Sequence, residues 1–353
     1  MIPRLLSQPV FAKVAILLGD PRCPDRVKPG SAFSNDDAAE VTILKDTLAK
    51  LDQYQFIYLD HHASLIDDLR RERPGFVMNF CDNGFHNNPQ QELHIPALLE
   101  IMNIPYSGAG PDCLLFSYDK FIVSQLARRI GVPTPEEILF TGDFSILDNW
   151  SIFPAMVKPN AADNSVGITE RSVVYDPEAL KAHIKHLLFD LRIQDILVQE
   201  FLPGTEYRVT MIGNSERGFI YLPTFEWDYS ALPPDVPPIL THDSKYDISG
   251  PYDLLKSRHS ILSPSFQRSI EQYSEALFKA LRCRDCAKID YRLDRQGQIK
   301  LVEFNPNPSW DAGAYINQED IDKGYHYIDI LRLLIEVGQI RYAPDTSCFR
   351  RQA

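Results

Sequence analysis

The stretch KIDYRLDRQGQIKLVEFNPNPSW (residues 288–310) decides the fold. Two runs of alternating apolar and polar residues flank a turn at 294–297, which predicts an antiparallel hairpin. Successive strand side chains point to opposite faces of a sheet. The pattern therefore predicts an apolar face that packs on a core, made of Ile289, Tyr291, Leu293, Val302 and Phe304. The opposite face gathers Lys288, Asp290, Glu303 and Asn305.

This polar face predicts a metal site. Carboxylates that share a face repel each other, and each costs free energy to desolvate. A bound divalent cation offsets both the repulsion and the desolvation cost. Hard oxygen ligands favour Mg²⁺, or Mn²⁺, over zinc. Glu303 and Asn305 lie two apart on one strand, and Asp290 can join them from the neighbouring strand. Mg²⁺ usually completes its shell with substrate phosphates, so the set indicates a nucleotide site. A solvated, charged hairpin face is the alternative.

Composition bounds the class of protein. The chain has 353 residues with 44% apolar content, enough for two or three domains. A formal net charge of −12 argues against a nucleic-acid partner. No apolar run approaches the roughly 20 residues that span a bilayer, and the N-terminus is interpreted as a strand rather than a signal peptide. Six scattered cysteines suggest reduced thiols and a cytoplasmic location.

Element patterns predict three units. The first third alternates predicted strands and helices, which is typical of a parallel sheet with crossover helices; the strands are 11–19, 55–60 and 76–80, and the helices are 37–51, 64–72 and 94–102. A smaller α+β unit follows, with a strand at 153–160, a helix at 176–191 and a strand pair formed by 196–202 and 207–213. A Pro-rich loop at 231–254, a helix at 263–282 and the hairpin complete a mixed-sheet unit. We expect domains 1–118, 119–212 and 213–353.

Further residues indicate nucleotide binding. Lys158 ends a strand and opens a polar loop whose backbone N–H groups can cradle phosphate. Gln199 and Glu200 close another strand and can offer backbone groups to a purine, and Glu206 can accept ribose hydroxyls. Lys120 is a second cation near a domain boundary. For both lysines a solvated surface position is the alternative.

Taken in order, these pieces resemble the ATP-grasp superfamily, specifically its D-alanine–D-alanine ligase-like branch. The resemblance covers most of the chain and rests on IPYSGAG (104–110) with YDK (118–120) and GVPTP (131–135), VKP (157–159) with NSVGI (164–168), VQEFLPGTEYRV (198–209), DSKY (243–246), KIDYRLD (288–294) and GQIKLVEFNPNP (297–308).

The resemblance implies a role for each matching residue. The implied phosphate contacts are Lys120 and Lys158, with Asn164 and Ser165 in a covering loop. The implied adenine hinge is Gln199, Glu200 and Leu202, with Glu206 on the ribose. Asp290, Glu303 and Asn305 would bind two Mg²⁺ ions, and Lys245 and Tyr246 would lie on a closing loop that excludes water from an acyl phosphate.

The amino-acid pockets depart from the family pattern. The ligases carry an arginine two residues before the first metal carboxylate, where this chain has Lys288, an ammonium that can still stabilise an oxyanion. The ligases' acidic motif after the first strand is absent here, and Ser309, Trp310 and Asp311 follow the metal motif. We expect Ser309, Trp310 and Asp311 to line a substrate pocket together with Asn79, Asp82 and His86. For Trp310, core packing is the alternative.

The expected function is ATP-dependent ligation of an amino acid amine to a phosphate-activated acceptor. Altered pockets favour an amino-acid ligase of specialised metabolism, such as the relatives that extend mycosporine-glycine. A D-alanine–D-alanine or other dipeptide ligase is the second reading, and a regulatory relative without turnover and a plain kinase are the remaining ones. The expected partners are small molecules, without nucleic acid or membrane. Relatives are commonly dimers, which favours a homodimer.

Overall fold

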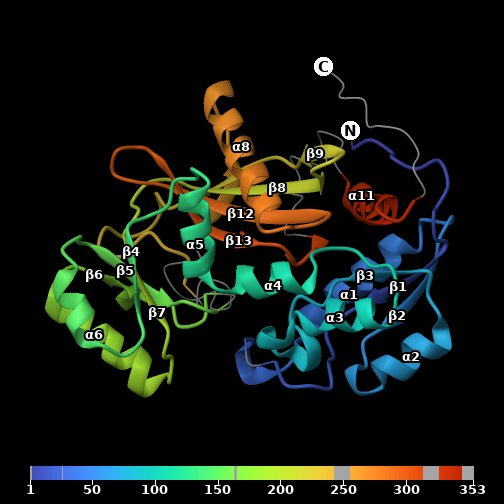
Figure 1. The fold of residues 1–353 in the computed structure, drawn as a ribbon, viewed down its shortest axis with the longest axis horizontal. Helices are drawn as coiled ribbons and strands as arrows, with labels where there is room; N and C mark the ends of the chain where they lie inside the picture. The colour runs from blue at the N-terminus through green and yellow to red at the C-terminus, as the bar shows by residue number, and fades with distance from the viewer. Residues whose placement is uncertain (1, 26, 163–164, 242–254, 313–325, 344–353) are drawn as a thin grey trace.

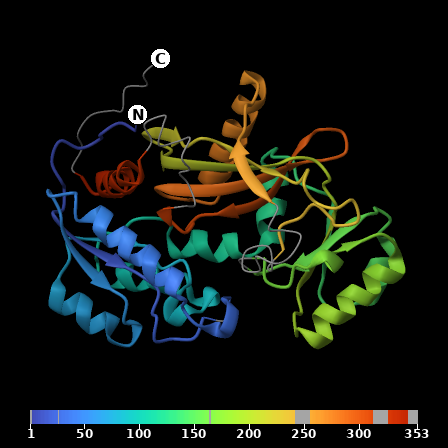
Figure 2. The same cartoon turned by 180° about the vertical axis from the view of Figure 1, so that it is seen from behind.

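Three β-sheets organise the chain in a computed structural model that describes residues 2–25, 27–162, 165–241, 255–312 and 326–343. In Figure 1 the first sheet lies at the right, the second at the left and the third across the top between them. Figure 2 shows the same arrangement from behind, with the third sheet again spanning the other two.

The first unit is a parallel three-layer sandwich. Its elements are β1 (Lys13–Leu17), α1 (Asn35–Leu48), β2 (Gln55–Leu59), α2 (Leu65–Glu72), β3 (Phe76–Asn79) and α3 (His94–Ile101). The strand order is β2-β1-β3, and both pairings are parallel. Alternate β1 residues divide between the faces: Val14 and Ile16 pack under α1, whereas Ala15 and Leu17 pack under α2 and α3. The predicted parallel α/β unit is therefore confirmed.

The second unit is an antiparallel sheet with one covering helix. Two connecting helices, α4 (Pro111–Tyr118) and α5 (Lys120–Arg129), lead to β4 (Glu137–Phe140), β5 (Ala155–Pro159), β6 (Val173–Val174), α6 (Pro177–Lys185) and β7 (Ile196–Glu200). The strand order is β4-β7-β5-β6. The expected pairing of 196–202 with 207–213 is wrong, because β7 pairs with β4 and β5.

The third sheet receives the strand that was expected in the second. Its elements are β8 (Glu206–Asn214), β9 (Gly218–Tyr221), β10 (Phe225–Asp228), β11 (Lys256–His259), α8 (Pro264–Ala280), β12 (Cys286–Leu293) and β13 (Ile299–Asn305). The order is β11-β10-β8-β12-β13, with β9 also on β8. The expected domain boundary at residue 212 thus falls inside β8, and we propose that the second unit ends in the β7–β8 connection.

The decisive hairpin forms, but with a bulge. Asp290 pairs with Glu303 and Tyr291 pairs with Leu301, so Val302 has no cross-strand partner in this register. The extra residue reverses the alternation. Leu301 and Phe304 enter the core under α8, whereas Val302 turns to the same side as Glu303. The assignment of Val302 to the apolar face is therefore wrong, and Leu301 takes that place.

The last described helix packs against both the first and the third unit. Helix α11 (Tyr327–Ile340) packs in one core cluster with β1, β3 and α1, although it follows the third sheet in sequence. Ile212 and Cys286 of the third sheet belong to the same cluster, so α11 contributes to a core that the first and third units share. Among the described helices, none combines the length and apolar character needed to cross a membrane.

Candidate active site

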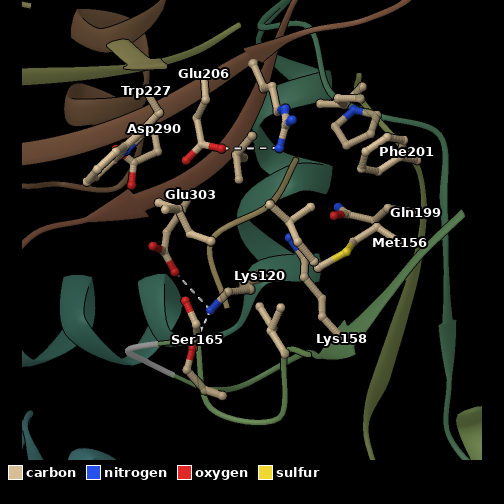
Figure 3. A pocket seen from close by; sticks show the side chains of 18 of the residues that line it. Lys120, Met156, Lys158, Ser165, Gln199, Phe201, Glu206, Trp227, Asp290 and Glu303 are labelled. Carbon is tan, nitrogen blue, oxygen red and sulfur yellow. Dashed lines mark hydrogen bonds and ion pairs between the residues drawn. The ribbon is translucent and has the colours of Figure 1, made fainter. Parts of the chain in front are cut away.

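A cavity of about 710 Å³ opens between the second and third sheets (Figure 3). It is lined by ten residues that the sequence singled out: Lys120, Lys158, Ser165, Gln199, Glu200, Leu202, Glu206, Lys288, Asp290 and Glu303. These residues come from both sheets and from the start of α5, so the fold brings together positions that are far apart in the sequence.

Two carboxylates lie side by side on the third sheet. Asp290 and Glu303 are direct cross-strand partners on β12 and β13. The Nζ of Lys120 lies 3.1 Å from Glu303 Oε1. Burial alone would raise the pKa of Glu303, but the ammonium groups of Lys120 and Lys288 lower it to about 2. Glu303 is therefore ionised at neutral pH and presents a permanent negative charge to the cavity.

Lys158 faces these carboxylates from the second sheet. It ends β5 and is only 5% exposed. Burial and the nearby charge of Lys120 lower the pKa of Lys158 to about 8. The chain then turns at Ser165, which has a φ of 60° and whose carbonyl accepts a hydrogen bond from the Ile168 N–H at 2.9 Å. A buried ammonium beside a tight turn is suited to an anionic group, which would restore the favourable charge balance.

The β7–β8 connection forms the inner wall. Phe201 N–H donates to the Pro154 carbonyl at 3.1 Å, which ties this connection to β5. The Gln199 amide donates to Glu137 Oε2 at 2.6 Å. A Cβ on Gly204 would lie 2.5 Å from Leu293 Cβ, so only glycine lets the connection pass this close to the end of β12. This close passage directs Glu206 into the cavity as β8 begins.

Glu206 is held by a buried network. Its Oε2 lies 3.3 Å from Arg292 Nη1 and accepts a hydrogen bond from the Tyr229 hydroxyl at 2.9 Å. Burial raises the pKa of Glu206, and Arg292 opposes that shift. The second carboxylate oxygen remains available to a hydroxyl donor in the cavity, since a carboxylate offers several acceptor positions.

Several cavity residues were missed in the sequence. Arg208 lies two residues after Glu206 on β8, and Arg292 lies two residues after Asp290 on β12. Alternate residues of a strand share a face, so the sequence could have predicted both arginines as cavity residues. Trp227 lies on β10, whose pairing with β8 no local pattern announces. Val302 reaches the cavity only through the bulge.

A second, polar cavity of about 480 Å³ lies beside the ends of the first-unit strands. Its lining includes His86, Asn87 and Tyr118. His86 and Asn87 have φ values of 55° and 54°, a left-handed conformation that is uncommon outside glycine and is often found at functional sites.

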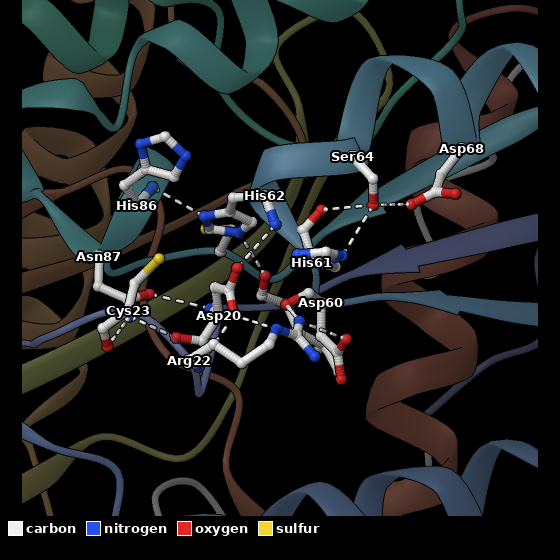
Figure 4. Close-up of polar contacts among 12 residues, drawn as sticks. Asp20, Arg22, Cys23, Asp60, His61, His62, Ser64, Asp68, His86 and Asn87 are labelled. Atoms are coloured by element: carbon white, nitrogen blue, oxygen red, sulfur yellow. Dashed lines mark hydrogen bonds and ion pairs between the residues drawn. The ribbon is translucent and has the colours of Figure 1, made fainter.

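A hydrogen-bond network holds this strained turn (Figure 4). The His86 N–H donates to His62 Nδ1 at 2.7 Å, and His62 Nε2 lies 2.9 Å from the Leu18 carbonyl. The His62 ring is therefore fixed as the neutral Nε2–H tautomer. Asp20, which is 1% exposed, accepts from the His62 N–H at 2.8 Å. The network presents the exposed His86 ring to the cavity.

The remaining predicted substrate residues divide into two groups. Burial, and then the negative charge of Asp311, raise the pKa of Asp82 to about 7. Ser309 Oγ donates to Asp311 Oδ2 at 2.6 Å. Asn79 is buried and its side chain accepts from the Cys81 N–H, which is turn chemistry. Trp310 is 6% exposed and packs in the core with α11, which matches the core-packing alternative.

The predicted metal set is only partly assembled. Asn305 lies opposite Lys288, and its amide oxygen accepts from the Asn307 N–H at 2.9 Å, so Asn305 is not part of the cavity lining. Within the described residues, no group of three or more His, Cys, Asp or Glu side chains is arranged so that it could hold a metal ion. Asn164, Lys245 and Tyr246 lie outside the described residues.

Comparison with known proteins decides the family. Residues 143–336 match the family model described as the D-ala D-ala ligase C-terminus. The chain belongs to this family. It is an ATP-grasp ligase that forms carbon–nitrogen bonds, and the family implies the use of ATP and Mg²⁺.

Similar proteins match this chain over most of its length. An uncharacterized protein, y4sG, from Sinorhizobium fredii is 31% identical over 251 residues, covering 70% of each chain. A D-alanine–D-alanine ligase from Carboxydothermus hydrogenoformans is 25% identical, covering 81% of this chain and 88% of the relative. The crystal structure of a D-alanine–D-alanine ligase from Bacillus anthracis complexed with ATP shares the fold, with a TM-score of 0.68 at 19% identity, covering 94% of this chain and all of that one.

Proposed function

We propose that this ligase transfers the terminal phosphoryl group of ATP to an acceptor oxygen and then joins an amino acid amine to the activated carbon. The observation that carries the proposal is the 710 Å³ cavity, in which Lys120 and Lys158 face Asp290 and Glu303. In the first step the acceptor oxygen bonds to the terminal phosphorus of ATP as the bond to ADP breaks. In the second step the amine nitrogen forms the C–N bond, phosphate departs from the activated carbon, and the amine loses a proton.

The donor set fits a nucleotide with a divalent cation. Asp290 and Glu303 offer adjacent carboxylate oxygens of the kind that Mg²⁺ prefers. Lys120 and Lys158 would hold phosphate oxygens, and the β7–β8 connection with Glu206 would hold the nucleoside. Bound Mg²⁺ would neutralise phosphate charge as transfer proceeds. Asn305, predicted as a third ligand, would have to turn from its contact with Asn307.

The protein's own side chains account for the remaining requirements. Lys120 and Lys158 are buried or nearly so, and a positive charge acts more strongly where water is scarce. Lys288 lies two residues before Asp290, on the same face of β12, and would stabilise the oxyanion that forms when the amine attacks. Positioning and charge neutralisation are the main needs of phosphoryl transfer.

The second cavity supports a polar acceptor. Its described lining consists of amide, imidazole, phenol and proline groups from Pro24, His86, Asn87, Asn88, Pro89, Gln90, Gln91 and Tyr118. Such groups suit an uncharged, hydroxyl-bearing body better than a second ammonium or carboxylate. Tyr118 lies two residues before Lys120, which connects this cavity to the nucleotide site along the chain. We propose a ring-bearing acceptor of specialised metabolism, as in mycosporine-like amino acid synthesis.

A dipeptide ligase is the second candidate. The names of curated relatives, including D-alanine–D-alanine ligase from Carboxydothermus hydrogenoformans, favour it. The negative charges of Asp82 and Asp311, which interact electrostatically, also suit an amino acid ammonium. The strained His86–Asn87 turn and the neutral lining of the second cavity favour the larger acceptor.

Product analysis tests the proposal. The full-length protein is incubated with ATP, Mg²⁺, single amino acids and either D-alanine or a metabolite extract, and products are identified by mass spectrometry. A new C–N-linked product with stoichiometric ADP and phosphate supports the proposal, and D-alanyl-D-alanine would select the second candidate. ADP with a stable phosphorylated product would indicate a kinase, and nucleotide binding without turnover would indicate a regulatory protein.

Location and assembly stay predictions. The cysteines among the described residues are free thiols, as expected for a cytoplasmic protein. A homodimer, the common state of relatives, is tested by the mass of the protein in solution.

A further inference from the structure

Arg208 lines the cavity between the second and third sheets. It lies on β8 directly opposite Asp290 on β12, and its Nε is 3.5 Å from Asp290 Oδ1. Its guanidinium also lies over the Trp227 ring, 5.4 Å from the centroid. The side chain is 22% exposed, so it is held between the sheet and the cavity. A guanidinium with two contacts of this kind is fixed in position before any ligand arrives.

The charges around Arg208 leave an excess of positive charge. Among the described residues, the lining contains five basic ones: Lys120, Lys158, Arg208, Lys288 and Arg292. It contains four acidic residues: Glu200, Glu206, Asp290 and Glu303. Two of the acids have other ion pairs, because Glu206 lies against Arg292 and Glu200 lies 3.6 Å from Lys300, which is outside the lining. Among the described lining residues, Lys120, Lys158, Lys288 and Arg208 therefore face Asp290 and Glu303, the two acidic residues without an ion pair to Arg292 or Lys300.

The position of Arg208 along β8 indicates which part of a nucleotide it meets. Glu206 and Arg208 lie on the same face of β8, two residues and therefore about 7 Å apart. With the ribose of a nucleotide at Glu206, a distance of this size would place the terminal phosphate of its polyphosphate chain near Arg208. The ion pair to Asp290 places the guanidinium beside the carboxylates that would take a cation.

We propose that Arg208 binds the terminal phosphoryl group of the nucleotide. This inference rests on the proposed function and gives a role to Arg208, which lies within the motif at 198–209 but to which the motif assigned no role. The guanidinium exchanges its contact with Asp290 for two phosphate oxygens, which its planar fork can hold together and a lysine cannot. Trp227 keeps the fork oriented during this exchange.

Calorimetry tests the assignment without relying on turnover. Binding of Mg²⁺ with ADP, and of Mg²⁺ with the non-hydrolysable β,γ-imido analogue of ATP, is measured for the wild type, Arg208→Gln and Arg208→Lys. We expect Arg208→Gln to weaken binding of the analogue by about 10- to 100-fold, the usual loss for a charge-assisted contact, and binding of ADP by less than about threefold. Arg208→Lys should recover part of the analogue's affinity, since it keeps the charge.

A matched control lies on the outer side of the same sheet edge. Arg258 on β11 is 62% exposed and pairs with Glu226 at 2.7 Å and Asp228 at 3.2 Å, the neighbours of Trp227 on β10. Arg258→Gln should leave both affinities unchanged. Equal losses of ADP and analogue, or no loss of either, in Arg208→Gln would overturn the inference. A wild type that binds neither ligand would instead overturn the proposed function.

Discussion

At the scale of single residues, Glu303 is the carboxylate on which turnover depends most. We predict that Glu303→Gln lowers kcat by about 100-fold or more, because losing even an indirect metal contact typically costs 10- to 100-fold. The cooperative fold should remain, since Gln keeps the shape of a side chain that is about 33% exposed. Steady-state kinetics and thermal unfolding measure both. Glu226→Gln, outside the cavity, is the control, and wild-type activity in Glu303→Gln would contradict the metal role.

Lys288 is expected to act on the bond-forming step. It lines the cavity beside Asp290, and Lys288→Ala should slow product formation at least about tenfold while changing the affinity for the ATP analogue by less than about threefold. Rapid-quench measurement of product and calorimetry of the nucleotide separate the two effects. Equal losses in both measurements would argue that Lys288 holds the nucleotide instead.

Asp82 gives the molecule a pH-dependent weakness. Its folded-state pKa of about 7 lies above the ordinary 3.8, so folding favours the protonated form. For this group, stability is therefore greatest below about pH 4, declines as the pH rises from about 4 to about 7, and levels off above that. Asp82→Asn should raise the unfolding free energy by about 1–3 kcal/mol at about pH 8, discounted because the side chain is partly exposed, with the gain vanishing near pH 4.

Urea unfolding across this pH range measures the effect. Asp68→Asn is a control of opposite sign, because the hydrogen bond from Ser64 lowers the pKa of Asp68. Its carboxylate therefore adds stability above the ordinary pKa and loses it as the pH falls. A gain for Asp82→Asn that did not change with pH would show that Asp82 is not destabilised by its own charge.

At the scale of elements, the β13 bulge sets what the hairpin shows to each side. Leu301 is 4% exposed in the core under α8, whereas Val302 lines the cavity. We predict that Leu301→Ala costs about 2–4 kcal/mol of unfolding free energy and Val302→Ala less than about 1 kcal/mol. Chemical denaturation compares the pair directly. Strict alternation along the strand would reverse the order of the two costs.

The same hairpin shows where sequence reasoning succeeds and fails. Local period located Lys288, Asp290 and Glu303 correctly, because side-chain direction along a strand depends on adjacent residues alone. It misplaced Val302, since a bulge is a property of two paired strands and leaves no mark in one of them. Trp227 was not predicted as a cavity residue for a related reason: its position in the cavity depends on the pairing of β10 with β8. The pairing of β8 with β12 rather than β7 is likewise decided by which faces must be buried.

At the scale of the whole molecule, one buried carboxylate ties the first and third units together. Asp285 is 1% exposed and precedes β12; it accepts from Arg341 at 2.7 and 2.9 Å, from the Gly108 N–H at 2.8 Å and from the Asn214 amide at 3.0 Å. Arg341 follows α11, Gly108 lies between α3 and α4, and Asn214 ends β8, so the three partners come from segments that are distant in the sequence. No local pattern predicts their meeting, which is why the position of α11 was not foreseen.

The junction at Asp285 should therefore be a point of weakness for the entire fold. We predict that Asp285→Ala lowers the unfolding free energy by about 3–5 kcal/mol, because the Arg341 charge is left buried without its partner. Arg341→Met in addition should recover part of that loss, and a double-mutant cycle measures the coupling. Asp112→Ala, which removes a surface pair to Arg282 at 3.6 Å, should cost no more than about 1 kcal/mol. If Asp285→Ala cost as little as Asp112→Ala, the first and third units would have to be held together by the apolar packing of α11 and by other contacts, such as that of the Asn307 amide with Glu92 at 2.7 Å.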